Sequence, residues 1–230
     1  RVLAWLLAPT EDLLGAVEAG IDLGVASLQQ LQQVTSAVAG GSRAQIHLKV
    51  DTGLGRNGAD PRDWEALFQA AKDAQDSGTV NVVGVFTHLS GTSVEADADQ
   101  GAVYDEALAV LGSVGLEPEI RHVASSIGTS DSPGLAYDMV RVGAAAYGVP
   151  VTPRYHQVGL IPAMRVSGQL ILVKRVHEGL GVGYGHTYRT SSETTLALVP
   201  LGYADGIPRH ASNAGPVSIA GERFSVSGRI

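Results

Sequence analysis

The chain has 230 residues, of which 44% are hydrophobic and 17% are charged, a balance typical of a globular protein with a sizeable core. The formal net charge of −7 and the lack of any basic block argue against nucleic acid or an anionic membrane as a partner. There is no cysteine, which excludes disulfides and thiolate metal sites and makes a reducing, cytoplasmic setting the default. No apolar stretch reaches the ~18 residues that a membrane span needs.

Short apolar runs alternate with helical patterns over the first two thirds of the chain. One helix is predicted to begin at Asp60, a cap residue followed by proline, and to bury a face that starts at Trp64. Ser27 and Gln30 fit a capping box ahead of another helix. The runs that predict strands are VLAWLL (2–7), DLGVAS (22–27), QIHLKV (45–50), NVVGVFTHL (81–89), EIRHVA (119–124) and DMVRVGA (138–144).

Repeated strand–helix units indicate a parallel α/β sheet, either doubly wound or closed into a barrel. The first strand is not followed by the glycine-rich turn of a doubly wound nucleotide fold. The pattern gives six units where a TIM-type (β/α)8 barrel has eight. We therefore expect residues 1–150 to form a partial barrel, incomplete at its amino end.

After Pro150 and Pro153 the pattern becomes β-rich, with strand-like runs at 164–176 and 194–202 and a predicted hairpin around Gly221. The chain then stops at Ile230 inside a predicted strand, and an open strand edge is a liability. We therefore expect residues 151–230 to form a β-rich carboxyl-terminal domain that is itself incomplete.

Polar residues recur at the carboxyl ends of the predicted strands, where a barrel carries its chemistry. Taken singly, a strand-end histidine would more simply be a hydrogen-bonded core residue, and Arg141 could pair with Asp138. Their recurrence on four strands instead favours one shared ligand site, because unpaired polar groups beside apolar runs are costly. The residues are Lys49, Asp51, Arg56, Thr87, His88, His122, Ser125, Ser126 and Arg141.

Two glycine-rich segments add to this interpretation. Glycines 53, 55 and 58 either mark a tight loop or let the backbone approach a ligand with Arg56 directed inward. The segment RVGAAAYG (141–148) offers small residues and backbone N–H groups after a strand, as barrels do where they hold a phosphate. Tyr184 lies between two glycines, and by itself this pattern indicates a tyrosine in a turn.

Seven segments together resemble, in order, the motifs of bacterial alanine racemase, a pyridoxal-phosphate (PLP) barrel enzyme with a β-rich carboxyl domain. They are KVDTGLGRNG (49–58), FTHLS (86–90), HVASS (122–126), VRVGAAAYG (140–148), GVGYGHTY (181–188), LGYADGIPR (201–209) and GRI (228–230). The resemblance covers nearly the whole chain and implies interconversion of L- and D-alanine for peptidoglycan, with PLP as cofactor.

The resemblance also implies catalytic roles. Tyr184 resembles the base that exchanges the α-proton of L-alanine in the pocket of the neighbouring subunit, so activity implies a homodimer. His88 is similar to the histidine that contacts this base. Arg141 resembles the arginine that binds the pyridine nitrogen, and because arginine keeps its proton, the ring would stay largely unprotonated.

Further roles follow for binding. Arg56 resembles the residue near the substrate carboxylate, and Tyr203 the tyrosine at the substrate entrance. Lys49 resembles a lysine that several members carbamylate and that orients the arginine. The cofactor-binding positions are Arg141, His122, Ser126, Gly143 and Ala144, and no metal is implied.

The chain departs from the family pattern in several places. The Schiff-base lysine of a KANAYG-type motif is absent, since Lys49, Lys72 and Lys174 stand in other contexts. A Met-Asp pair and a later tyrosine beyond GRI are absent too. These gaps predict a fragment that is inactive by itself. Ser125 and Leu54 replace a usual asparagine and a common methionine, which suggests a divergent member.

Three alternatives stay open. The enzymatic one is a racemase of another small amino acid, such as serine. A non-catalytic PLP-binding barrel is disfavoured by the β-rich region that carries Tyr184. A degenerate paralogue kept as a dimerisation partner is slightly favoured by Ser125.

Overall fold

The computed structural model describes residues 2–229 and divides into two compact units, Arg1–Ala163 and Met164–Ile230. The first unit carries a six-stranded sheet in the order β1-β2-β3-β4-β5-β6, with every neighbouring pair parallel. Each of the six predicted strands is found at its predicted place, although β1 and β6 are shorter than predicted. The parallel half-barrel and the β-rich region after it are confirmed. The strands are β1 (Val2–Ala4), β2 (Ile21–Val25), β3 (Ala44–Lys49), β4 (Val80–Phe86), β5 (Ile120–Ser125) and β6 (Met139–Arg141).

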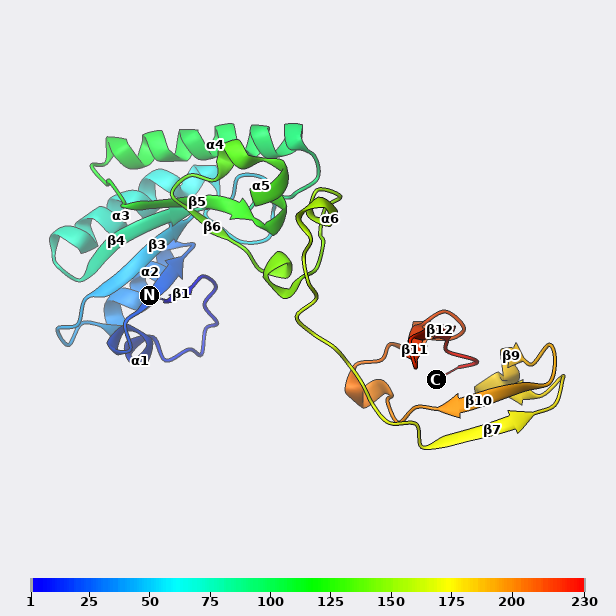
Figure 1. The fold of residues 1–230 in the computed structure, drawn as a ribbon. Coiled ribbons are helices and arrows are strands. Elements are labelled where there is room, and N and C mark those ends of the chain that lie inside the picture. Colours follow the sequence, from blue (N-terminus) through cyan, green and yellow to red (C-terminus); the bar gives the residue numbers. More distant parts are fainter. Residues whose placement is uncertain (1, 230) are drawn as a thin grey trace. The chain divides into compact units, whose positions relative to one another are not determined.

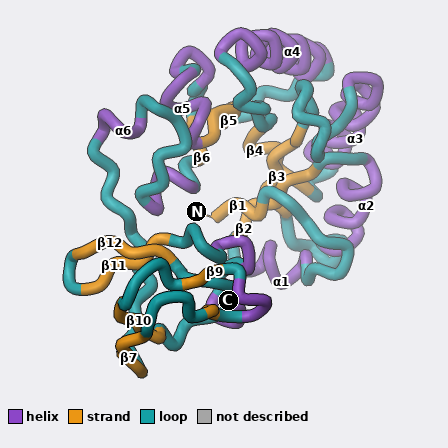
Figure 2. Tube along the Cα trace, turned by 90° about the vertical axis from the view of Figure 1, so that its right-hand side faces the viewer, coloured by secondary structure: helices purple, strands orange, loops and turns teal. Residues whose placement is uncertain are grey.

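The strands follow one another around an arc, and helices α2, α3 and α4 lie on its outer side (Figure 1 and Figure 2). This is the arrangement that right-handed strand–helix–strand crossovers produce. The strand ends that lead into the helices therefore share one rim of the arc. The helices are α1 (Leu13–Glu18), α2 (Leu28–Ala37), α3 (Trp64–Asp76), α4 (Val94–Ser113), α5 (Ser126–Asp131) and α6 (Tyr155–Val158).

Local sequence explains where two of these helices begin. The Asp60 carboxylate accepts the N–H of Arg62 at 3.0 Å, and a 3-10 turn over Pro61–Asp63 leads into α3. At α2 the Ser27 hydroxyl accepts the N–H of Gln30 at 3.2 Å, as predicted. The reciprocal bond of a capping box is not formed, because the Gln30 amide oxygen accepts from Ala26 N–H at 2.8 Å instead of from Ser27.

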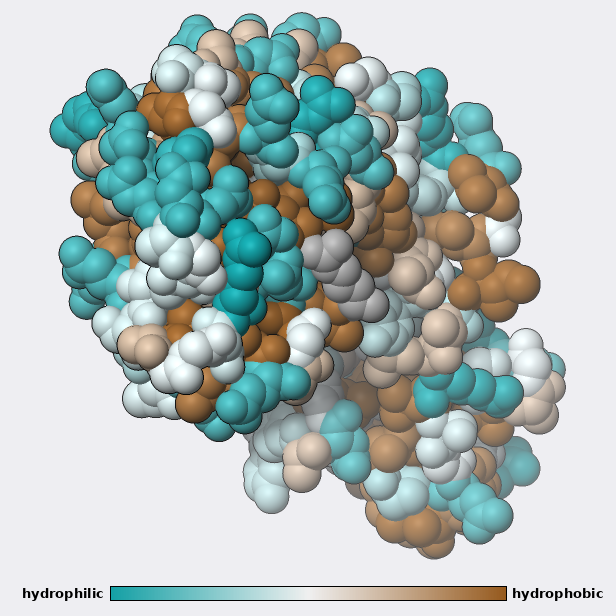
Figure 3. Space-filling model, turned by 90° about the vertical axis from the view of Figure 1, so that its left-hand side faces the viewer, coloured by the Kyte–Doolittle hydropathy of each residue, from teal (hydrophilic) through white to brown (hydrophobic). Residues whose placement is uncertain are grey.

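The core lies between the sheet and the outer helices. The buried face of α3 is the predicted one, formed by Trp64, Leu67, Phe68 and Ala71. Tyr104 of α4 is fully buried, and its hydroxyl donates to the Val85 carbonyl at 2.7 Å, which satisfies the polar end of the ring. The space-filling view in Figure 3 shows apolar patches among hydrophilic side chains, as is usual for a folded surface.

The second unit consists of three antiparallel strand pairs, and most of its described residues are exposed. The predicted hairpin is confirmed: Ala220 and Gly221 both have positive φ, 52° and 88°, as a type I′ turn requires. The pairs are β7 (Leu172–Val176) with β10 (Thr194–Leu198), β8 (Gly181–Val182) with β9 (Tyr188–Arg189), and β11 (Pro216–Ile219) with β12 (Glu222–Ser225).

The predicted final strand ends earlier than expected. It stops at Ser225, because Gly228 adopts φ 85° and donates its N–H to the Asn213 side chain at 2.7 Å. Ile230, with which the last motif ends, lies outside the described residues. Over residues 2–229 no helix combines the length and apolar character needed to cross a membrane.

Candidate active site

Arg141, the last residue of β6, connects the rim ends of three strands. Its Nη1 donates to the His122 carbonyl at 3.0 Å, and its Nη2 donates to the carbonyls of Thr87 and Val123 at 2.6 and 3.0 Å. Burial lowers the pKa of this guanidinium to about 10, which still leaves it charged at neutral pH. Its Nε is buried and has no hydrogen-bond partner among the described residues. Arg141 therefore holds one donor in reserve.

A chain of buried polar side chains leads away from this arginine. Arg141 Nη1 lies 2.6 Å from His122 Nδ1, His122 Nε2 lies 2.9 Å from His47 Nδ1, and His47 Nε2 lies 3.3 Å from Asp22 Oδ2. An arginine can only donate, so His122 must accept at Nδ1 and carry its proton at Nε2. His47 then accepts at Nδ1 and donates to the carboxylate. The order of donors fixes both tautomers.

His122 is held neutral by its surroundings. Burial, then the charge of Arg141, lowers its pKa to about 2. Its ring stacks on Phe86 with centroids 4.6 Å apart and planes inclined by 7°. This histidine therefore connects the arginine to the sheet without adding a charge of its own.

Lys49 ends β3 as a buried amine. The side chain is 1% exposed, and its Nζ has no hydrogen-bond partner among the described residues. The Nζ lies 5.5 Å from the ring centroids of both Trp5 and Phe86. Burial, followed by the charges of Arg56 and Arg141, lowers its pKa to about 8. An appreciable fraction of this amine is therefore neutral near physiological pH.

His88 follows β4 and lies against the same arginine. Its Nδ1 is 3.3 Å from Arg141 Nη2, and its ring is 5.6 Å from that of Trp5. Burial, then the charges of Arg141, Arg56 and Lys49, lowers its pKa to about 4. The imidazole is neutral at pH 7 and can accept a hydrogen bond from the arginine.

The ends of β5 and β6 form a second polar region. The Ser126 hydroxyl accepts from the N–H groups of Gly143 at 3.0 Å and Ala145 at 3.4 Å, with Ala144 between them. Tyr155 donates its hydroxyl to the Ser126 carbonyl at 2.7 Å. Backbone N–H groups, a hydroxyl and small side chains are the chemistry that suits a phosphate.

The glycine loop after β3 is held by its own aspartate. Asp51 Oδ1 accepts from the N–H groups of Gly53 and Gly55 at 2.9 and 3.1 Å. Gly58 has φ 138°, and a Cβ there would lie 2.5 Å from backbone atoms of Val50 and Asp51. The tight-loop interpretation of these glycines is therefore correct at Gly58. Arg56 is exposed on this loop, close enough to Lys49 and His88 to lower both pKa values.

Other polar residues of the rim serve the fold locally. Thr52 and Thr87 share a buried hydroxyl–hydroxyl bond of 2.9 Å. Ser125 precedes α5 without a side-chain cap bond. The alternative in which Arg141 pairs with Asp138 is wrong, because Asp138 binds Arg121 through bonds of 2.8 and 3.1 Å. Arg121 alternates with His122 along β5 and faces solvent, which brings it to the exposed carboxylate.

The structure thus brings Lys49, His88, His122 and Arg141 together. Tyr184 and Tyr203 belong to the second unit, where they are 78% and 56% exposed. Tyr184 begins a short turn between Gly183 and Gly185, whose φ values are 70° and 68°. The assigned roles of these tyrosines stay predictions.

Sequence reasoning missed Trp5, Asp22 and His47. The last two are polar residues inside apolar strand runs, IDLGV and QIHLKV, and both are buried. A buried polar residue in such a run needs a partner, and that signal could have indicated them. Trp5 gave no such signal, because it reads as part of an apolar strand.

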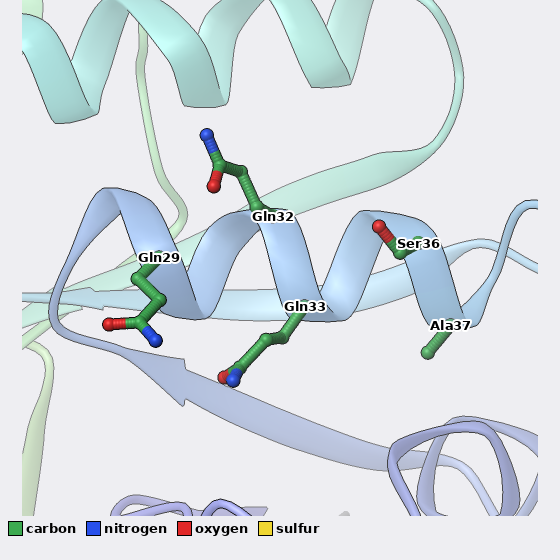
Figure 4. Close-up of a pocket in the computed structure, with 5 residues that line it drawn as sticks. All are labelled: Gln29, Gln32, Gln33, Ser36 and Ala37. Atoms are coloured by element: carbon green, nitrogen blue, oxygen red, sulfur yellow. The ribbon is translucent and has the colours of Figure 1, made fainter.

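One surface hollow lies apart from this group. It measures about 560 Å³, runs along α2 and is shown in Figure 4. It holds no titratable side chain and none of the predicted site residues, so it offers no chemistry of its own. Its lining is Gln29, Gln32, Gln33, Ser36 and Ala37.

Comparison with known proteins gives consistent matches over both units. The family model "Alanine racemase, N-terminal domain" matches residues 1–151, and "Alanine racemase, C-terminal domain" matches residues 163–230. An alanine racemase of Salinispora arenicola is 48% identical over the whole chain. The chain spans 62% of that relative's length.

Solved structures match equally well. The crystal structure of alanine racemase from D-cycloserine-producing Streptomyces lavendulae superposes with a TM-score of 0.95 at 45% identity, covering 100% of this chain and 62% of that one. Alanine racemase from Streptomyces coelicolor gives a TM-score of 0.94 at 43% identity, with the same coverage.

The neutral His122 predicts a specific pH dependence of stability. Its pKa is about 2 in the fold and about 6.5 when unfolded, so the unfolded chain binds the extra proton below pH 6.5. Above pH 6.5 the neutral His122 makes its full contribution to the free energy of unfolding. This contribution is lost as the pH falls toward 2, at about 1.4 kcal/mol per pH unit. When the pH falls from 6.5 to 5, the free energy of unfolding should decrease by about 2 kcal/mol more in the parent chain than in His122→Gln. Urea unfolding of both chains measures this difference, and parallel pH curves would contradict it.

Proposed function

The chain belongs to the alanine racemase family, and on that premise we propose that the whole protein interconverts L- and D-alanine with PLP. We propose further that it works in the cytoplasm, as a homodimer, in the synthesis of peptidoglycan. Residues 1–150 would form the cofactor-binding part and residues 151–230 the part that supplies a base to the partner. Family membership over both units supports this activity, and one feature of the site carries it: the reserved donor of Arg141.

The described residues fit a phosphorylated pyridine cofactor. The buried Arg141 Nε lacks a partner, and a ring nitrogen is an acceptor of matching chemistry. The Ser126 hydroxyl, which accepts from the N–H groups of Gly143 and Ala145, keeps its own proton to donate to a phosphate oxygen. Arg141, Ser126, Gly143 and Ala144 would hold the cofactor, with His122 behind the arginine. PLP, when bound, supplies the electron-withdrawing ring that weakens the Cα–H bond of an amino acid.

Arg141 would restrain rather than maximise that electron withdrawal. Its pKa of about 10 means that it donates a hydrogen bond at neutral pH without giving up the proton. Its Nη groups are already fixed by strand-end carbonyls, so the Nε direction is set before any ligand arrives. His88 accepts from the same guanidinium and is neutral, which keeps a further cation away from the reacting atom.

Tyr184 would hold and move the α-proton on one face of the substrate. Its exposure and its flanking glycines support a role in another molecule's pocket, because no neighbouring Cβ shields the ring. Arg56 would bind the substrate carboxylate through its two-pronged guanidinium, and Tyr203 would line the entrance.

The activity is tested on the whole protein loaded with PLP. With L-alanine in deuterated water, we expect D-alanine and deuterium at Cα. Tyr184→Phe should lower kcat at least about 100-fold, as loss of a general base does, while Tyr188→Phe from the same segment should keep it. Chiral chromatography and mass spectrometry measure both. Equal turnover of serine would favour a broader racemase, and no turnover of either amino acid would overturn the proposal.

We propose that the 230 residues by themselves do not racemise alanine. Their lysines lie in KVDTGLGRNG, in α3 and in β7, and none stands in the motif that carries the family's Schiff base. Incubated with PLP and L-alanine, the 230-residue chain should show no Cα deuteration above that of free PLP. The whole protein serves as the positive control, and exchange at its rate in the chain alone would contradict the claim.

We also propose that Lys49 reacts with carbon dioxide to form a carbamate beside Arg56 and Arg141. A pKa of about 8 leaves roughly a tenth of the amine unprotonated at pH 7, and the nearby cations would stabilise the new anion. Carbon-13 NMR with labelled bicarbonate should show a carbamate signal that Lys49→Met removes. Lys72→Met is the control, since that amine pairs with Asp76. A signal that survives Lys49→Met would refute the assignment.

A further inference from the structure

The first turns of α4 carry two buried polar side chains that belong neither to the seven motifs nor to the group around Arg141. Asp97 is 1% exposed and Gln100 is 8% exposed. A polar group in such a place is costly unless it is bonded, so its partners show what it is for. Their partners are Ser90 and Gly91, in the turn that follows His88, and Ser132 at the end of α5.

Gln100 binds Ser90 at two atoms. Its Oε1 accepts the Ser90 N–H at 3.0 Å, and its Nε2 donates to the Ser90 hydroxyl at 2.9 Å. The glycine loop packs on the same side chain, since a Cβ on Gly53 would lie 3.3 Å from Gln100 Cγ. One amide thus supports the loop of His88 and touches the loop of Arg56.

Asp97 binds the next residue of the turn and the end of α5. Its Oδ1 accepts the Gly91 N–H at 3.1 Å, and its Oδ2 accepts the Ser132 hydroxyl at 3.0 Å. Gly91 has φ 64°, a turn conformation that the sheet does not impose. Ser132 closes the helix that Ser126 opens. The carboxylate therefore connects the His88 turn to the segment of the proposed phosphate group.

These bonds begin where the sheet's own bonding ends. Thr87 N–H donates to the His122 carbonyl at 3.3 Å, the last ladder bond of this strand end. His88 comes next, and the N–H groups of Ser90 and Gly91 are bonded by the α4 side chains rather than by a strand. The direction of His88 is therefore set from both sides, by the ladder before it and by α4 after it.

We propose that Gln100 and Asp97 are positioning residues that hold His88 against Arg141 by clamping the turn 89–91. This inference rests on the proposed racemase function for its kinetic consequences only. His88 faces Arg141 from β6, Lys49 from β3 and Arg56 from the glycine loop, with the Trp5 ring beside it. A loosened turn would let His88 move away from these cations toward water.

The test compares Gln100→Leu and Gln100→Glu in the whole protein. Leucine keeps the volume and removes both bonds, whereas glutamate keeps an oxygen for the Ser90 N–H and lets the hydroxyl donate. Gln69→Leu, on the exposed face of α3 where the amide donates to Asp73 at 2.9 Å, is the matched control. Ser90→Ala removes the hydroxyl that accepts from Gln100 Nε2 and from the N–H and hydroxyl of Thr92. It keeps the bond between the Ser90 N–H and Gln100 and covers the case in which the leucine variant fails to fold.

Two measurements are made on each variant. In the protein without added PLP, hydrogen exchange of residues 88–93 should quicken about tenfold in Gln100→Leu, as expected for losing about 1.4 kcal/mol of local stability. In the loaded enzyme, kcat should fall about tenfold with KM within about twofold, and the acid limb of kcat/KM should move upward from the low pKa of His88. Ser90→Ala should show smaller changes of the same sign, and Gln100→Glu and Gln69→Leu should match the parent.

The outcomes separate the two ideas. The proposed positioning role is overturned if folded Gln100→Leu exchanges the amide hydrogens of residues 88–93 at the parental rate. It is overturned as well if this variant only melts at a lower temperature while kcat and the pH profile stay as in the parent. If the parent protein does not racemise alanine, the proposed function fails, and the exchange measurement still decides the clamp.

Discussion

The site depends on one buried guanidinium. Arg141 replaces the water it loses with the carbonyls of Thr87, His122 and Val123, which belong to two neighbouring strand ends. A buried cation without such partners would cost several kcal/mol. Because backbone atoms of the rim supply the bonds, the arginine can turn only as far as the sheet allows. The fold thereby fixes the direction of the one donor that remains.

A carboxyl group is connected to this arginine through two histidines. Asp22 on β2 is reached through His47 and His122, each passing one hydrogen bond across the sheet. Two imidazoles separate the guanidinium from the Asp22 side chain, so the arginine is not paired directly with that carboxyl group. An aspartate in direct contact would have neutralised the positive charge of the guanidinium locally. The arrangement suits a site that must attract an anion.

Apolar periodicity could predict the strands and α3 because burial alone selects those patterns. It could not predict the His47–His122 contact, whose members lie 75 residues apart and meet only when β3 and β5 share a sheet. The same limit applies to Gln30, since the choice between Ala26 and Ser27 as partner depends on the exact path of the chain. The spacing in the sequence suggested Asp138 as an ion-pair partner of Arg141. In the structure the alternation of side chains along β5 directs Arg121 toward Asp138, and these two residues form the ion pair. The seven motifs identified the family, and the assigned roles of Tyr184 and Tyr203 remain predictions.

The cations of the rim also work against one another. After burial, which has the largest effect, Arg56 and Arg141 lower the pKa of Lys49, and all three cations lower the pKa of His88. Each charge therefore makes the next one less favourable. A folded chain tolerates this only because core burial elsewhere compensates. A carboxylate beside the same groups would reverse the sign of these interactions, because its negative charge would favour their charged forms. The repulsion between the like charges at this rim, which costs stability in the folded chain, would therefore become an attraction when an anionic group binds.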